Sequence, residues 1–296
     1  MDKKVVIIGA GEIGTAIAKS LKDVNTADIF LWDKDTLKVP EQKPLSEIVP
    51  QADFVFFCVP SWIMRVAVAE VSQYLIPKAI IISLAKGIEV ETLKTMNEVL
   101  GEALPKGQKF ALLSGPMIAE ELVAGARGFG VVATASEEVY SSINNLFKNT
   151  NIFTEYSADI RGVALSAVLK NVYAVSLGIA DGLKWSGNAK SWLAAKAIKE
   201  MSEISEILGG TKETILGTAG LGDLLATGFS EHSRNHQIGD ELVKTGKILL
   251  KGEGVASLNS VLKLLGEKSK DFVLLSALAG IIINGEDAKS ALEKLR

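Results

Sequence analysis

Three glycines near the start of the chain, Gly9, Gly11 and Gly14, have the spacing of a loop that binds phosphate groups. They directly follow the apolar run 4–8 and open a stretch with helical spacing. In such a turn the first glycine permits a tight bend, the second lets the backbone approach a pyrophosphate, and the third allows close helix packing. Free N–H groups at the helix start also favour an anion. The pattern therefore predicts dinucleotide binding in preference to a simple tight turn.

An acidic residue beyond this loop bears on which dinucleotide is bound. Asp33 ends the second apolar run, where its carboxylate could accept hydrogen bonds from the adenosine ribose 2′-hydroxyl and would repel a 2′-phosphate. The neighbouring Lys34 favours the opposite choice. Glu12, inside the loop, must turn outward to avoid repelling a pyrophosphate. The sequence favours NAD as the cofactor and leaves NADP open.

A second group of polar residues lies in the C-terminal half. Lys170 and Asn171 interrupt an otherwise apolar stretch, and charged side chains are rarely buried without a partner. The lysine could extend along the surface with its ammonium group in water, or it could face a cleft. Asp223 stands at a predicted helix start, where it could cap the helix or balance a cation. Both interpretations stay open for both charged residues.

Further along, Ser233, Arg234 and Asn235 form a set of hydrogen-bond donors suited to a phosphate or carboxylate. The alternative is an arginine in a surface salt bridge. His232 and His236 are spaced four residues apart, but no nearby carboxylate completes a metal site. We expect no metal, and we expect both histidines to be solvated loop residues.

The elements that must position these residues differ between the two halves of the chain. In the first half, helical stretches at 13–21 and 62–75 alternate with short apolar runs that are typical of buried parallel strands. These runs lie at 4–8, 28–32, 54–59, 79–84, 110–113 and 130–133. The alternation predicts a doubly wound sheet. Three prolines in the connection 34–51 leave room for at most a very short helix there.

Beyond about residue 156 the pattern becomes helical, with little strand signal. The predicted helices lie at 162–183, 190–208, 235–244 and 272–283. Turn signals at Gly209, Gly210, Gly217, Gly220 and Gly222 break this half into segments. We therefore expect an α/β dinucleotide-binding Rossmann domain over 1–157 and an all-α, substrate-binding domain over 158–296.

Composition sets limits on the possible functions. The 296 residues carry a net charge of −3, which gives no indication of a nucleic-acid surface. A single cysteine, Cys58, excludes an internal disulfide, and its place in an apolar run indicates packing rather than nucleophilic catalysis. No signal peptide is recognisable, and no uninterrupted apolar run approaches the length of a membrane span. We expect a cytoplasmic protein that binds no membrane.

Taken together, the motifs resemble those of the soluble NAD(P)-dependent glycerol-3-phosphate dehydrogenases, over nearly the whole chain. In chain order they are the glycine loop, AKGIE at 85–89, SGP at 114–116 with Ala119 and Glu120, LKNV at 169–172, IADGL at 179–183 with Gly187 and Asn188, GLGDL at 220–224, SRN at 233–235 and GEG at 252–254. The resemblance implies a Rossmann domain followed by an all-α domain of the 6-phosphogluconate-dehydrogenase-like type. It also implies interconversion of dihydroxyacetone phosphate and sn-glycerol 3-phosphate, which supplies glycerophospholipid synthesis.

The same resemblance assigns roles to residues. Lys170 would be the general acid/base at the substrate C2 oxygen, Lys86 a second cation near substrate and cofactor, and Asp223 the group that orients and balances them. A ketone that accepts hydride builds negative charge on oxygen, which a nearby ammonium group stabilises and protonates. The residues implied to hold the substrate are Gly115, Asn171, Thr227, Ser233, Arg234 and Asn235. Those implied to hold the cofactor are Gly9, Gly11, Glu12, Ile13, Gly14, Asp33, Lys86, Ala119, Arg234 and Glu253.

Several positions depart from the family pattern. Ile13 replaces an aromatic residue, Met117 replaces a polar residue after the Gly-Pro pair, Lys196 replaces an arginine, and the connection after the second strand is short. These departures leave open a ketopantoate- or 3-hydroxyacid-type reductase, because Lys170 and Asn171 would serve those substrates as well. A nucleotide-binding sensor without turnover is a further alternative, although the presence of the lysines, Asp223 and Arg234 together argues against it. The resemblance also implies a homodimer.

Overall fold

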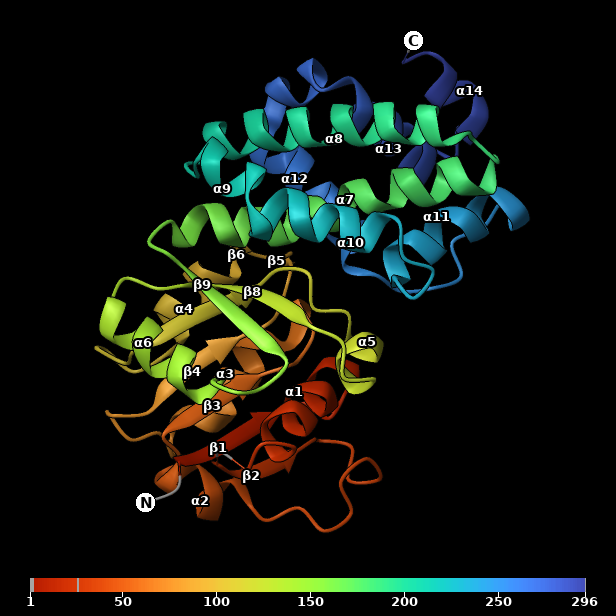
Figure 1. Ribbon diagram of the computed structural model, residues 1–296. Coiled ribbons are helices and arrows are strands. Elements are labelled where there is room, and N and C mark those ends of the chain that lie inside the picture. The colour runs from red at the N-terminus through yellow and green to blue at the C-terminus, as the bar shows by residue number, and fades with distance from the viewer. Residues whose placement is uncertain (1–2, 26, 296) are drawn as a thin grey trace. The chain divides into compact units, whose positions relative to one another are not determined.

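The computed structural model describes residues 3–25 and 27–295, which form two compact units (Figure 1). The division assigns residues 1–89 and 94–160 to unit 1 and residues 90–93 and 161–296 to unit 2. The sequence prediction placed the domain boundary after residue 157, whereas the main division in the structure falls between residues 160 and 161.

Unit 1 is built on a seven-stranded sheet with the order β2-β1-β3-β4-β7-β8-β9. The strands are β1 (Lys3–Ile8), β2 (Ala27–Trp32), β3 (Phe54–Phe57), β4 (Ile80–Ser83), β7 (Phe110–Ser114), β8 (Gly128–Ala133) and β9 (Ile152–Ser157). The first five run parallel, which confirms the predicted doubly wound Rossmann architecture. A separate two-stranded ribbon pairs β5 (Ile88–Glu89) with β6 (Lys94–Thr95).

Two features of this sheet differ from the prediction. Strand β8 runs antiparallel to β7, so the expectation that 130–133 is parallel was wrong. An apolar run indicates burial but carries no information on strand direction. Strand β9, parallel to β8, was not predicted. Its residues are mostly exposed or half-buried, because it pairs with β8 at one end of the sheet order and therefore lacks a continuous apolar run.

The helices of unit 1 are α1 (Glu12–Lys22), α2 (Leu45–Ile48), α3 (Met64–Ser72), α4 (Met96–Ala103), α5 (Ala119–Val123) and α6 (Glu137–Leu146). The predicted helix at 13–21 is confirmed as α1. The predicted helix at 62–75 is shorter than expected, since a 3-10 turn over Ser61–Ile63 precedes α3. The four residues of α2 confirm that the proline-rich connection holds only a very short helix.

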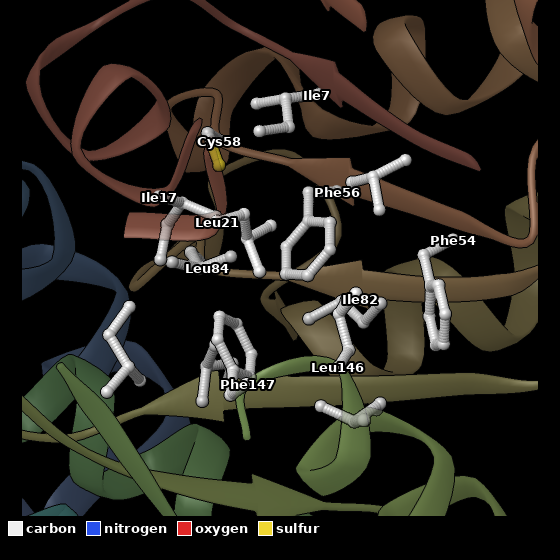
Figure 2. Packing of buried hydrophobic residues seen from close by; sticks show 14 of the residues in the cluster. Ile7, Ile17, Leu21, Phe54, Phe56, Cys58, Ile82, Leu84, Leu146 and Phe147 are labelled. Atoms are coloured by element: carbon white, nitrogen blue, oxygen red, sulfur yellow. The ribbon is translucent and has the colours of Figure 1, made fainter. Parts of the chain in front are cut away.

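The core of unit 1 forms where strands meet helices on one face of the sheet (Figure 2). Phe56 of β3 is fully buried and meets Phe147 edge-on, with 6.0 Å between ring centroids. Ile17 and Leu21 of α1 are fully buried in the same cluster. Cys58 also belongs to it, and burial raises the pKa of its thiol to about 12, so the residue packs and does not act as a nucleophile.

Unit 2 is helical over the described residues 161–295, as predicted. Its helices are α7 (Ile160–Gly182), α8 (Gly187–Ile207), α9 (Lys212–Leu216), α10 (Asp223–Gly228), α11 (Arg234–Thr245), α12 (Glu253–Leu265), α13 (Val273–Asn284) and α14 (Ala288–Glu293). Helix α12 was not predicted. Helix α7 is long and apolar enough, by length and composition, to cross a membrane. The sequence has no unbroken apolar run of that length and so did not indicate this. The most apolar window of the helix is completely buried inside the protein. It is therefore the central core helix of the unit.

A buried carboxylate ties three helices of unit 2 together. Glu200 of α8 is 6% exposed and accepts the backbone N–H groups of Leu274 (2.7 Å) and Leu275 (2.9 Å) at the start of α13. It also accepts the hydroxyl of Tyr173 from α7 at 2.7 Å. Burial raises the pKa of Glu200 despite these hydrogen bonds, which act to lower it. The carboxylate caps a helix to which it does not belong, and so fixes α13 against α7 and α8.

Candidate active site

The glycine loop joins β1 to α1 in the geometry that the motif predicts. Gly9 has φ +103°, and a Cβ there would lie 2.5 Å from the Cys58 carbonyl oxygen. A Cβ on Gly14 would lie 1.9 Å from the Gly9 carbonyl oxygen, so both positions need glycine for packing within the chain. A Cβ on Gly11 would meet no protein atom within 4 Å. Protein packing thus gives no reason for this glycine, whereas the approach of a pyrophosphate does, and the loop fits a dinucleotide.

The remaining proposed cofactor residues of unit 1 lie around this loop. Glu12 is exposed, as an outward-turned carboxylate requires, while Ile13 and Ala119 are half-buried against the core. Asp33 lies directly after β2 and accepts the Ala10 N–H at Oδ2 (2.7 Å), which couples it to the glycine loop.

Lys86 and Gly115 follow the carboxyl ends of the neighbouring strands β4 and β7. The Lys86 ammonium donates to the Gly115 carbonyl oxygen at 3.3 Å. Gly115 has φ +146°, and a Cβ there would lie 2.4 Å from the Phe129 carbonyl oxygen, so only glycine fits. Ligands of open α/β sheets bind beyond the carboxyl ends of the strands, and this edge is where both residues stand.

In unit 2, a buried ion pair joins α7 to α10. Lys170 and Asp223 are 5% and 2% exposed, and the lysine Nζ lies 3.1 Å from Asp223 Oδ1. Thr227, one turn further along α10, accepts from Lys170 Nζ at 2.7 Å and donates to the same carboxylate oxygen at 3.1 Å. The surface interpretation of Lys170 was therefore wrong. The capping interpretation of Asp223 was also wrong, because Gly222 holds the N-cap position and the carboxylate faces the lysine.

A π-helical turn over Thr218–Gly222 delivers Asp223 to this position. Within that turn, a Cβ on Gly220 would lie 2.1 Å from the Ile215 carbonyl oxygen, so the backbone passes too close for any other residue. Such π turns often occur at functional sites. Asp223 balances the lysine charge in a region from which water is largely removed, where an unpaired ammonium group would be costly.

A pair of amides connects the same part of α7 to the starts of α11 and α12. Asn235 Nδ2 donates to Asn171 Oδ1 at 2.8 Å, and Asn235 Oδ1 accepts the Gly254 N–H at 3.0 Å. Asn171 Nδ2 in turn donates to the Ala167 carbonyl oxygen at 3.1 Å. Through these bonds the two proposed substrate residues hold α7, α11 and α12 together, and Glu253 is the first residue of α12.

The first turn of α11 carries the proposed anion-binding residues. Arg234 is exposed at the first helical position, and Ser233 is the N-cap, its hydroxyl accepting the His236 N–H at 3.4 Å. His232 is exposed in a turn, as expected. His236 is not a solvated loop residue, because it lies in α11, is 6% exposed and places Nε2 2.7 Å from Asp181 Oδ2. The helical periodicity of 235–244 could have revealed its burial, but the loop interpretation ignored it.

Asp181 is a residue to which the sequence interpretation gave no role. Near the end of α7, its Oδ1 accepts from Lys190 of α8 at 2.5 Å while its Oδ2 meets His236. Although burial opposes it, these two partners lower the pKa of Asp181. Within the described residues no cluster of three or more His, Cys, Asp or Glu side chains could hold a metal ion.

Comparison with known proteins decides the family. The model of the NAD-dependent glycerol-3-phosphate dehydrogenase N-terminus matches residues 36–140, and that of the C-terminus matches residues 159–293. A glycerol-3-phosphate dehydrogenase (NAD(P)+) of Fusobacterium nucleatum is 31% identical, covering 99% of this chain and 96% of its own length. The enzyme of the same name from Chlorobium limicola is 34% identical over 97% and 96%, respectively. The chain belongs to the NAD-dependent glycerol-3-phosphate dehydrogenase family.

Solved structures support the fold that this family implies. Glycerol-3-phosphate dehydrogenase from Coxiella burnetii has a TM-score of 0.89 at 24% identity, covering 99% of this chain and 98% of its own. A ketopantoate reductase from Ralstonia eutropha has a TM-score of 0.61 at 18% identity, covering 96% and 100%. Both comparisons concern the fold alone, and it is closer to the glycerol-3-phosphate dehydrogenase.

Two departures from the family pattern have local explanations. Met117 is 8% exposed and belongs to the core of unit 1. Its sulfur packs against Gly130 of β8, where an added Cβ would lie only 3.2 Å from it. The residue fills space over β8. Lys196 places its ammonium 5.4 Å from the Trp192 ring centroid, a cation–π contact one turn along α8.

Proposed function

We propose that this chain interconverts dihydroxyacetone phosphate and sn-glycerol 3-phosphate with NAD(H) or NADP(H). Beyond family membership, the observation that supports this is the buried Lys170–Asp223–Thr227 cluster. A nicotinamide cofactor, when bound, would supply the hydride chemistry at the substrate C2. The protein's own contribution is a proton donor held in one position for the C2 oxygen.

Lys170 is proposed to protonate that oxygen as negative charge develops on it. An ammonium group both stabilises the charge and transfers the proton, and general acid catalysis of this kind accelerates reactions by about 100-fold or more. Once Lys170 becomes neutral, the Asp223 carboxylate 3.1 Å away has lost its counter-charge, which favours the return of a proton to the lysine. The Thr227 hydroxyl accepts from Lys170 and so fixes the direction of the Nζ–H bonds.

The substrate phosphate is proposed to bind at the start of α11. Arg234 offers a planar guanidinium in an exposed position, and the helix N-terminus adds partial positive charge. Ser233 and Asn235 are largely committed to holding the helix and so act mainly by positioning. As the family resemblance implies, Lys86 and Gly115 are proposed to contact the substrate. Lys86, Glu253 and Arg234 are proposed to contact the cofactor.

The test is the initial rate of NADH and NADPH oxidation with dihydroxyacetone phosphate, measured beside ketopantoate under identical conditions. The proposal predicts rapid turnover of the phosphorylated ketone and little of ketopantoate. The opposite preference would establish the ketopantoate-type alternative, and binding of nucleotide without turnover of either would establish the sensor alternative.

A second measurement addresses the phosphate site itself. Arg234→Met should raise the KM for dihydroxyacetone phosphate by about tenfold or more, as expected for the loss of a charge-assisted bidentate contact. At saturating NADH, which removes the effect of the proposed cofactor contact of Arg234, it should change the much weaker turnover of unphosphorylated dihydroxyacetone little. Equal losses with both substrates would contradict phosphate binding by Arg234.

We further propose a cytoplasmic homodimer that supplies glycerol 3-phosphate for glycerophospholipid synthesis, as the family resemblance implies. Light scattering of the purified protein tests the dimer. A mass of 31.5 kDa, that of the single chain, would contradict it.

A further inference from the structure

The connection that follows β2 is anchored by one glutamine, Gln42. Its Oε1 accepts the Asp33 backbone N–H at 2.8 Å, and its Nε2 donates to the Asp33 carbonyl oxygen at 2.8 Å. One side-chain amide thus satisfies both backbone polar groups of Asp33, much as a neighbouring strand would. The backbone of Asp33 is held just past the end of β2, beside the proposed cofactor loop.

The carboxylate of Asp33 is fixed from the other side. Oδ2 accepts the Ala10 N–H at 2.7 Å and Oδ1 accepts the Asp35 N–H at 2.9 Å. Although burial acts against it, these amides and Lys38 lower the pKa of Asp33, so the group is a carboxylate at neutral pH. Each carboxylate oxygen has two lone pairs. Oδ2 also faces the Lys38 ammonium at 3.4 Å, whereas Oδ1 accepts the Asp35 N–H and can accept one more donor. The side chain is 13% exposed, which leaves it accessible from solvent.

This arrangement suits a ribose with free hydroxyls. The adenosine ribose of NAD(H) presents hydroxyl donors, whereas the 2′-phosphate of NADP(H) adds negative charge and no donor at neutral pH. Lys38 Nζ lies 3.4 Å from Asp33 Oδ2, but its side chain is 48% exposed, and ion pairs of that exposure contribute little. Lys34 is exposed as well. Two backbone N–H groups fix the carboxylate, and Gln42 fixes the backbone that carries it. This fixed negative charge dominates over the two solvated lysines.

We infer that Gln42 is a specificity-determining positioning residue: by fixing Asp33 it makes this chain select NAD(H) over NADP(H). Gln42 acts through Asp33 and is assigned no contact with the nucleotide. The inference rests on the proposed function only in taking a nicotinamide dinucleotide as the ligand.

The test is the ratio of dissociation constants for NADPH and NADH, obtained from quenching of tryptophan fluorescence without substrate. The wild-type ratio should be about ten or more, which corresponds to the loss of one hydrogen bond to a charged group. Asp33→Asn should bring the ratio close to one. Gln42→Met, which matches the glutamine in length but forms neither bond, should reduce the ratio at least about threefold while Asp33 is still present.

Two further variants make the result specific to Gln42. Gln73→Met makes the same chemical change at an exposed glutamine that bonds its own helix, at the Glu70 carbonyl oxygen, and should leave the ratio unchanged. Gln42→Ala removes the same two bonds with a smaller side chain, should lower the ratio as Gln42→Met does, and serves if Gln42→Met does not fold. Thermal unfolding of each variant accompanies the titrations.

Each outcome bears on a separate statement. Equal affinity of the wild-type protein for both nucleotides would overturn the inference. An unchanged ratio in Gln42→Met, or in Gln42→Ala if Gln42→Met does not fold, would remove Gln42 from it. Selective binding of NADH without turnover of dihydroxyacetone phosphate would contradict the proposed reaction and leave the inference standing.

Discussion

Replacing Lys170 by methionine tests whether the Lys170–Asp223 pair is as desolvated as its geometry indicates. The two side chains are 6% and 4% exposed and lie 3.1 Å apart. Removing one partner of such a pair leaves the other charge buried alone, which costs about 3–5 kcal/mol of unfolding free energy. For a domain of this size that corresponds to a fall of about 6–20 °C in the unfolding midpoint.

The same substitution at Lys270 provides the matched control. Lys270 pairs with Glu267 at 2.6 Å, but the side chains are 73% and 91% exposed. Lys270→Met should therefore change the unfolding free energy by less than about 1 kcal/mol. Chemical denaturation followed by circular dichroism measures both variants.

A double substitution separates stability from catalysis. Lys170→Met combined with Asp223→Leu replaces the pair with apolar groups, which should restore most of the lost stability. Its kcat should stay at least about 100-fold below wild type, because no general acid remains. A cost below about 1 kcal/mol for Lys170→Met alone would refute the buried-pair reasoning, and an active double variant would refute the catalytic role.

Three further predictions concern unit 2. His236→Leu should raise the KM for dihydroxyacetone phosphate more than it lowers kcat, since the pair with Asp181 positions the start of α11, whereas His232→Leu should change neither constant. Gly178→Ala should cost about 1–3 kcal/mol in urea denaturation, because the new Cβ would lie 2.0 Å from the His236 carbonyl oxygen, while Gly187→Ala places a Cβ in open space and should cost little. Because the pKa of Glu200 is raised, the folded protein binds a proton at Glu200 more tightly than the unfolded chain does. The stabilisation that comes from protonated Glu200 is therefore fully present below pH 4.5 and is lost as the pH rises through the raised pKa. Glu200→Gln cannot ionise, and its unfolding free energy should lack that decline; parallel pH profiles for the two proteins would contradict the assignment.

The features that sequence alone predicted are local ones. The glycine loop and α1 follow from a motif and a periodicity within a few residues, and the burial of β1, β3 and β4 follows from their apolar character. The direction of β8 was not predictable in this way, because the pairing partner β7 and the returning chain decide it. The edge strand β9 was missed because partial exposure weakens its apolar pattern.

The site shows the same division between local and distant information. Lys170, Asp223 and Thr227 were singled out from their motifs, but the contacts of Lys170 with the other two join positions more than fifty residues apart. No spacing in the sequence brings His236 to Asp181, and nothing in the residues around Gln42 indicates a bond to both backbone groups of Asp33. Pairings of this kind depend on how the helices and loops pack, which a periodicity does not contain.

The burial of α7 has a consequence for attempts to redesign this protein. Lys170 and Asn171 belong to a helix whose residues from 162 to 180 are all buried, so most neighbouring positions on it already fill core space. Substitutions there would trade stability for any new specificity. The first turn of α11 is different, because Arg234 is exposed while the backbone behind it is anchored by Asn235 and His236. Libraries that seek a new substrate should therefore leave α7 intact and vary Arg234 and its exposed neighbours.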